Sequence, residues 1–117
     1  MSAQEDLYDR AVDLVADGKT EEAVAVYREA LALDRDFVDA WTGLALALAE
    51  LQRFDEAIEA GKRLVELEPE DPLSYTNLSR FYQQLGNVPE AEAWAAKARI
   101  ADWKQQIREG EKDKSPA

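Results

Sequence analysis

The chain has 117 residues with 25 acidic and 14 basic side chains, a formal net charge of −11, which excludes nucleic acid because such binding needs a basic surface. It contains neither cysteine nor histidine, which excludes disulfides, thiol nucleophiles, histidine general bases and the usual zinc ligands. The length suits one domain, and only carboxylates, amines and hydroxyls remain for any chemistry.

The first predicted helix opens the chain, whose polar start lacks the basic residues and apolar run of a secretory signal. Apolar residues recur at i, i+4 and i+7 in Leu7, Ala11 and Leu14, the pattern of one face of an amphipathic helix. Gly18 is expected to end this helix in a left-handed conformation. A second helix is then expected from Thr20, whose hydroxyl could cap its first turn.

The third and fourth helices repeat this pattern. Asp36 could cap the third helix, Gln52 stands in the place of Gly18, and the fourth helix is expected from Phe54. The longest apolar stretch, residues 40–49, is too short to cross a bilayer, so we expect no membrane contact. The apolar faces of these two helices are Trp41, Ala45 and Leu48, then Ala57, Gly61 and Leu64.

The fifth helix has a strong start signal in Asp71 followed by Pro72, and Gly86 is expected to end it. A sixth helix is expected from Val88. Because Trp103 stands where a helix-ending proline would be expected, this helix should run past residue 105 toward Gly110. Residues 111–117 are short and charged and are expected to form a disordered tail.

The pair Glu22-Ala23 returns as Glu56-Ala57 and as Glu90-Ala91, each time 34 residues later. The helices therefore group into three repeats, residues 4–37, 38–71 and 72–105, within one domain at 4–110. A helical hairpin of this length cannot bury its own apolar face, so the repeats should stack against one another.

These segments resemble the tetratricopeptide repeat. The resemblance implies an all-α fold, a right-handed superhelical solenoid of three helix-turn-helix repeats with an extended C-terminal helix. Gly61 departs from the pattern, since its counterpart is the bulky Tyr27; we expect it to admit the ring of Tyr75 or Tyr82. The residues that carry the resemblance are Leu7, Trp41 and Tyr75, then Ala11, Ala45 and Ser79, then Ala23, Ala57 and Ala91, and Pro69.

The resemblance also assigns a concave groove, which receives peptides, to the side of the first helices that core packing does not use. Residues 4–71 hold 19 acids and 7 bases, a net of −12. We expect the groove to bind a protein or peptide segment with basic residues and apolar anchors. The predicted groove residues are Tyr8, Asp9, Val12, Val15, Asp39, Thr42, Leu46, Glu50, Leu73, Thr76, Asn77, Arg80, Gln83 and Gln84.

Two alternatives to this groove stand beside it. The acidic residues could simply keep the helix faces solvated, and Val12, Val15 and Leu46 could pack against neighbouring first helices.

Members of the family that bind chaperone tails grip a terminal carboxylate with cations and amides. The corresponding positions here are not cationic, which argues against such a role; they are Tyr8, Val12, Gly43, Leu73 and Asn77.

A second candidate surface lies on the last helix, where Ala96, Ile100, Trp103 and Ile107 recur at helical spacing. A fourth repeat would normally cover this stripe. We expect Ile100, Trp103 and Ile107 to form a homodimer interface or to dock another subunit. Trp94 is expected to pack back over the third repeat as its cap.

The carboxylate pairs of the chain lie at expected helix ends and outward faces, where nothing excludes water or raises a pKa. We therefore predict no catalytic residues, no metal site and no cofactor. The sequence indicates a cytoplasmic, non-catalytic interaction module, a scaffold or adaptor. The alternatives are a self-assembling structural subunit and a regulatory subunit of a larger complex.

Overall fold

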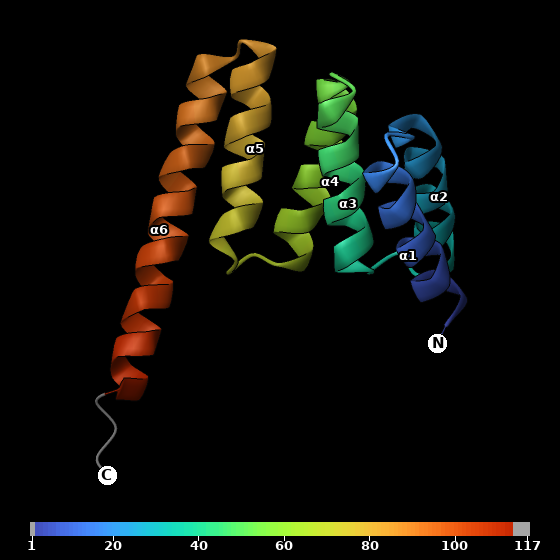
Figure 1. Ribbon diagram of the computed structural model, residues 1–117. Helices are drawn as coiled ribbons and strands as arrows, with labels where there is room; N and C mark the ends of the chain where they lie inside the picture. The colour runs from blue at the N-terminus through green and yellow to red at the C-terminus, as the bar shows by residue number, and fades with distance from the viewer. Residues whose placement is uncertain (1, 114–117) are drawn as a thin grey trace.

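The computed structural model describes residues 2–113, which form six helices (Figure 1). The predicted helix starts at Thr20, Phe54 and Val88 are confirmed. Within the described part of the chain, no helix has the length and apolarity needed to span a membrane. The helices are α1 (Ala3–Ala16), α2 (Thr20–Leu33), α3 (Val38–Glu50), α4 (Phe54–Leu67), α5 (Pro72–Leu85) and α6 (Val88–Asp113).

Helices pack in chain order, because each one contacts the helix before it and the helix after it. Three hairpins, α1–α2, α3–α4 and α5–α6, stand side by side in a row, with α1 also touching α3 (Figure 1). The resulting array measures 49 × 40 × 23 Å. This is the predicted all-α solenoid, in which each repeat covers the apolar side of the next.

The turn inside each hairpin is built in the same way three times. Gly18 and Gly86 have φ angles of 78° and 92°, and Gln52 takes the same left-handed conformation at 62°. After each of them a backbone N–H reaches back to a carbonyl near the helix end, at 2.8, 2.8 and 2.9 Å. These bonds satisfy carbonyls that the helix leaves without partners, and they confirm the predicted glycine ends.

Helix starts follow the sequence only in part. Asp71 caps α5, since its carboxylate accepts from the Leu73 backbone N–H at 3.0 Å, as predicted. Thr20 and Asp36 do not cap. Thr20 is already inside α2 and its buried hydroxyl faces Glu50 across the hairpins, at 3.5 Å. Asp36 instead pairs with Arg63 of α4 at 2.7 Å, so it ties the loop between α2 and α3 to α4.

The core follows the predicted columns of small residues. Ala11, Ala23, Ala45 and Ala57 are completely buried, which lets neighbouring helices approach closely. The prediction that Gly61 makes room for the ring of Tyr75 or Tyr82 is wrong. A Cβ at Gly61 would lie 2.8 Å from Leu78 Cδ2, whereas Tyr75 and Tyr82 are not the side chains that fill this gap. Because of the direction in which α5 crosses α4, Leu78 and Phe81 fill the space beside Gly61. Their exposed fractions are 0% and 1%.

The last helix is longer than predicted. α6 continues through Gly110 to Asp113 and has 26 residues, whereas the other helices have 13 or 14. A glycine weakens a helix without necessarily ending it, so Gly110 is not a stop. The predicted tail is therefore wrong for residues 111–113, and residues 114–117 lie outside the described part of the chain. In Figure 1 the C-terminal part of α6 extends past α5.

Candidate functional site

The predicted groove residues all lie on the first helix of a hairpin. Four come from α1, four from α3 and six from α5. Three of the apolar ones are open to solvent, with exposed fractions of 40% for Val12, 44% for Leu46 and 65% for Leu73. Val15 packs against the core instead. The side chains of Val12 and Leu46 are thus available for contact, which favours the groove over the alternative of packing between first helices.

Tyr8 packs against two aromatic rings of its own repeat at the acidic end of these helices. Its ring centroid lies 6.1 Å from that of Tyr27 and 5.4 Å from that of Phe37. Burial raises the pKa of the Tyr8 hydroxyl above its usual value of 10.0, and the carboxylates of Asp39 and Asp9 raise it further. Tyr8, Asp9 and Asp39, three of the predicted groove residues, therefore lie near one another, with the two carboxylates exposed and on different repeats.

Gly43 allows this aromatic cluster to form. A Cβ at Gly43 would overlap the ring of Tyr27, whose Oη would be 2.6 Å away. Tyr27 is only 3% exposed and cannot move aside. The missing side chain at this position is thus a packing requirement, and sequence reasoning missed it because the two residues are far apart in the chain.

Several polar residues of the predicted groove already have partners. The Thr42 hydroxyl donates to the Val38 carbonyl at 3.0 Å, and the Thr76 hydroxyl donates to the Pro72 carbonyl at 3.1 Å. A ligand could still use them as acceptors, since a hydroxyl has two lone pairs. The exposed polar groups on α5 are Thr76, Arg80, Gln83 and Gln84, with Asn77 half-buried.

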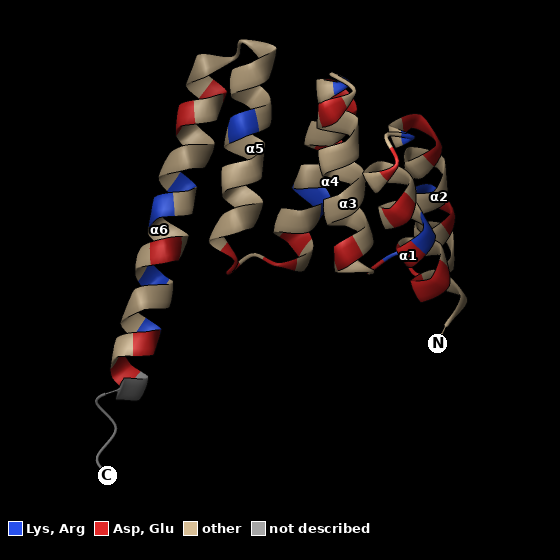
Figure 2. Ribbon diagram, viewed as in Figure 1, with Lys and Arg blue, Asp and Glu red and all other residues tan. Residues whose placement is uncertain are grey.

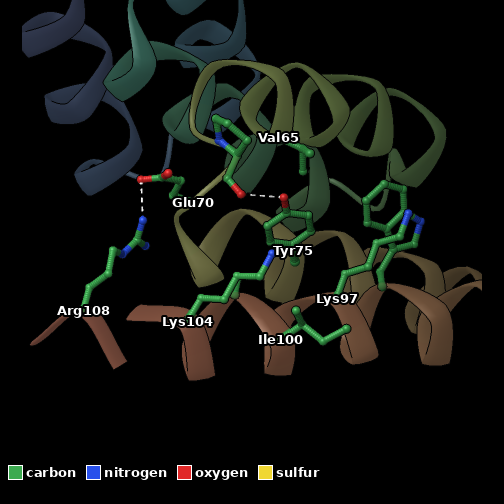
Figure 3. A pocket seen from close by; sticks show the side chains of 10 residues that line it. Val65, Glu70, Tyr75, Lys97, Ile100, Lys104 and Arg108 are labelled. Atoms are coloured by element: carbon green, nitrogen blue, oxygen red, sulfur yellow. Dashed lines mark hydrogen bonds and ion pairs between the residues drawn. The ribbon is translucent and has the colours of Figure 1, made fainter. Parts of the chain in front are cut away.

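A hollow of about 400 Å³ that the sequence did not reveal lies between α4, α5 and α6 (Figure 3). The Tyr75 hydroxyl donates to the Pro69 carbonyl at 2.6 Å at one wall. Arg108 pairs with Glu70 at 2.9 Å, so the end of α6 is tied to the turn before α5. The lining residues are Val65, Pro69, Glu70, Tyr75, Trp94, Lys97, Ile100, Ala101, Lys104 and Arg108.

A second hollow of the same kind lies one repeat earlier. It is lined by Leu31, Arg35, Trp41 and Arg63, each 34 residues before a residue that lines the first hollow. Here too an aromatic residue is bonded to the turn, because Trp41 Nε1 donates to the Arg35 carbonyl at 2.8 Å. The hollows are therefore a regular product of repeat stacking, and the signal that could have located them is the 34-residue period itself.

Trp94 behaves as predicted. It is half-buried, and its ring stacks on that of Tyr75 with the centroids 6.2 Å apart and the planes at 28°. Lys97 Nζ lies 4.2 Å from the Trp94 centroid, a cation–π contact. Trp94 therefore holds α6 onto the third repeat.

The large residues of the predicted stripe are open to solvent, with exposed fractions of 52% for Ile100, 62% for Trp103 and 40% for Ile107. The expectation that a fourth repeat would cover them is wrong. One repeat earlier, the counterparts of Ile100 and Trp103 are Glu66 and Pro69, which are exposed although the next repeat is present. The stripe lies on the outer side of α6, with Ile100 at its edge also lining the hollow beside α4 and α5.

The charged residues are unevenly placed along the array. Figure 2 shows acidic residues on all four helices of the first two hairpins, whereas α6 carries basic and acidic residues together. Three bases, Lys97, Lys104 and Arg108, line the hollow beside α6. The acidic groove end and these three bases are therefore at opposite ends of the molecule.

Comparison with known proteins agrees with this architecture. Two family models of the tetratricopeptide repeat match residues 8–72 and 48–107. Superkiller complex protein 3 of Mus musculus is 31% identical over 78 residues, which cover 67% of this chain and 5% of that protein. The protein STIP1 homolog of Dictyostelium discoideum is 37% identical over 68 residues, covering 58% of this chain and 12% of that protein. The chain thus spans only a small part of the curated relatives that it matches.

Solved structures share the fold at low identity. MamA has a TM-score of 0.85 and 23% identity, with 89% of this chain and 61% of that chain covered. The Yersinia enterocolitica secretion chaperone SycD, in complex with a peptide of the translocator YopD, has a TM-score of 0.78 and 22% identity. The match covers 90% of this chain and 84% of that chain. The second TPR of Spaghetti (RPAP3), bound to the HSP90 peptide SRMEEVD, has a TM-score of 0.76 and 19% identity, with 84% of this chain and 91% of that chain covered.

The first family model, which matches residues 8–72, covers more than half of the chain. The three turns with the same hydrogen bond and the buried alanine columns are the structural counterpart of that match. The chain belongs to the tetratricopeptide repeat family.

Proposed function

We propose that the chain is a non-catalytic interaction module that binds a peptide or protein segment along α1, α3 and α5. The observation that carries the proposal is an exposed apolar side chain on each first helix: Val12 and Leu46 lie 34 residues apart at equivalent positions of α1 and α3, and Leu73 lies on α5 seven residues before their counterpart Arg80. Isolated exposed apolar residues are common, but one on each successive repeat forms a line that an extended segment can follow. SycD with its YopD peptide and the RPAP3 domain with its HSP90 peptide support this use of the fold.

The ligand that fits this groove is basic and has apolar anchors. Asp9 and Asp39 both act on the Tyr8 hydroxyl, so two carboxylates lie close together at the N-terminal end. A carboxylate-rich tail such as the SRMEEVD peptide of the RPAP3 complex would need cations there, and Tyr8, Val12 and Gly43 supply none. We therefore expect this chain to select the opposite charge.

A charge-reversal experiment tests the proposal. A library of labelled peptides that combines leucine anchors with either lysine or glutamate is screened by fluorescence anisotropy at low salt. Lysine-containing members should bind, and Asp9→Lys with Asp39→Lys should weaken them on the order of tenfold, about 1.4 kcal/mol. Glutamate-containing members should bind weakly to the native chain.

The matched control is Glu29→Lys with Glu59→Lys, which changes the net charge equally but alters exposed residues of α2 and α4. It should retain most of the affinity. Equal weakening in both variants would show that binding follows net charge only, and unchanged affinity after reversal of Asp9 and Asp39 would remove the electrostatic basis of the proposal. A Leu46→Asp variant separately tests the apolar line.

A second candidate function is self-assembly. The observation that favours it is the exposed Trp103 on α6, because an exposed tryptophan between isoleucines is costly to leave in water. A role as a regulatory subunit would use the same two surfaces.

A further inference from the structure

We propose that α6 pairs with α6 of a second copy of this chain, the two helices running antiparallel about a two-fold axis at Trp103. The surface that pairs is the outer stripe, defined as Ala96, Ile100, Trp103, Ile107 and Gly110. Its three large side chains are the exposed ones described above. The inference deepens the second candidate function and does not depend on peptide binding in the groove.

The spacing of the outer stripe is that of a helix-pairing seam. Its members follow one another at intervals of four, three, four and three residues. This alternation keeps side chains in line along one side of a helix and is the spacing of a coiled-coil interface. None of the five members is charged, although charged residues flank them in the sequence.

The outer stripe is also nearly symmetric. Ile100 and Ile107 lie three residues before and four residues after Trp103, and the small residues Ala96 and Gly110 lie seven before and seven after it. Under a two-fold axis at Trp103, Ile100 of one copy faces Ile107 of the other, and each Ala96 faces a Gly110. A two-fold interface must be self-complementary, which is why the symmetry points to a second copy and not to an unrelated partner.

The outer stripe faces mostly away from the rest of the molecule, with Ile100 at its edge also lining the hollow between α4, α5 and α6. Trp94 packs on Tyr75, and Trp103 follows it by nine residues, about two and a half turns of helix, so the two rings point to opposite sides of α6. Ala101, which faces the array, is only 8% exposed. A second α6 can therefore approach without displacing any described helix.

Flanking charges suit the antiparallel arrangement. Lys97 and Glu111 are fourteen residues apart, almost four turns, so they lie on the same flank of the helix. The two-fold axis places this flank opposite the same flank of the second copy; Lys97, whose ammonium lies over Trp94 in the single chain, would then turn toward Glu111 of the second copy at both ends. Lys104 lies midway, where it can extend over the Trp103 ring of the second copy. Parallel pairing would instead place like charges together.

The contact is a single helix pair, smaller than the roughly 800 Å² per partner of a standard interface. We therefore expect a reversible dimer that forms as concentration rises. Sedimentation should show a mass that increases with concentration in the full chain and stays monomeric in Trp103→Glu. The matched control Gln105→Glu adds the same charge at an exposed site away from the outer stripe and should still dimerise.

Disulfide trapping tests the direction, because the chain has no cysteine of its own. Ile100→Cys and Ile107→Cys are prepared separately and then mixed under mild oxidation. The antiparallel register predicts a crosslinked heterodimer in the mixture and little crosslinking of Ile100→Cys alone. Replacing Ile107→Cys by Glu109→Cys, on another side of α6, should abolish the product.

Two results would overturn the proposal: a monomer at every concentration, or efficient crosslinking of Ile100→Cys with itself, which indicates parallel pairing. Circular dichroism of Trp103→Glu should match the native chain, because an exposed side chain is changed. The groove is tested separately by titrating a lysine-containing peptide into Trp103→Glu. Retained affinity there with lost dimerisation separates the two functions.

Discussion

Single small residues decide how closely the helices of this array approach. Gly61 has Leu78 Cδ2 at 2.8 Å from the position that a Cβ would take, and Leu78 is fully buried. Gly61→Ala should gain up to about 1 kcal/mol of helix propensity. It should lose about 1–3 kcal/mol by overpacking, so a net destabilisation is expected in urea unfolding.

Two further variants check this explanation. Gly110→Ala adds the same methyl to a helical glycine with no atom within 4 Å, so it should be neutral or stabilising. Leu78→Val in the Gly61→Ala background removes the atom that clashes and should recover part of the loss. If Gly61→Ala were as benign as Gly110→Ala, close packing at Leu78 would not be the reason for the glycine.

An ion-pair cluster between the first two repeats predicts a pH effect. Arg53 donates to Glu56 at 2.6 Å, and Arg28 of α2 lies 3.3 Å from the same carboxylate. The hydrogen bond from Arg53 lowers the pKa of Glu56 below its usual 4.5, and the charges of Arg53 and Arg28 add to this. A lowered carboxyl pKa means stability that is present above the unfolded-state value and is lost as pH falls through the folded-state value.

The corresponding test is thermal unfolding between neutral pH and pH values below 4.5 for the native chain and Glu56→Gln. The two should differ most at neutral pH and converge as Glu56 becomes protonated. Because the pair is exposed, the difference is expected to be small. A gap that stays constant down to low pH would show that Glu56 contributes by packing and not by charge.

Among the helices, α6 has the least support from its neighbours. It packs mainly against α5, and its last turns extend beyond α5 (Figure 1). Three contacts fasten it: the stacking of Trp94 on Tyr75, the hydrogen bond that the Ser79 hydroxyl donates to the Ala91 carbonyl at 2.7 Å, and the Arg108 pair with Glu70. In a linear array the loss of a terminal contact affects the terminal repeat first.

Trp94→Ala should therefore destabilise α6 by about 2 kcal/mol, less than for a fully buried tryptophan, because Trp94 is half-buried. Hydrogen exchange should show lower protection in α6 and α5, with α1–α4 nearly unchanged. Arg108→Ala should loosen only the end of α6, since its ion pair is exposed. A uniform loss of protection across all helices would mean that the array unfolds as one unit.

Across the whole array, negative charge opposes folding. The first two repeats carry a net charge of −12 and the rest of the chain +1, which gives −11, while the ion pairs between repeats are exposed and contribute little. Screening by salt should therefore remove more repulsion than attraction, and the free energy of unfolding should rise with NaCl. Urea unfolding at low and high NaCl measures this. Asp13→Asn with Asp17→Asn should show a smaller salt response, and a fall in stability with salt would contradict the prediction.

The turns and helix starts were largely predictable from the sequence, because they depend on residues close together in the chain. Gly18, Gln52 and Gly86 take the left-handed conformation, and Asp71 caps its helix as expected. The 34-residue period likewise predicted the order of stacking, since a hairpin with one apolar face must cover it with the next hairpin. Helical spacing places the predicted groove residues on one side of the first helices, whereas the resemblance to the family assigned a groove to that side.

Only the tertiary structure decided which side chain fills which gap. Leu78 rather than a tyrosine enters the space at Gly61, and the ring of Tyr27 occupies the space beside Gly43. These choices depend on the crossing directions of helices from different repeats, which no local pattern encodes. The hollow beside Tyr75 and the outward direction of Trp103 have the same origin: the sequence places residues on the faces of a helix, and the packing of that helix determines which face meets a neighbour and which meets water.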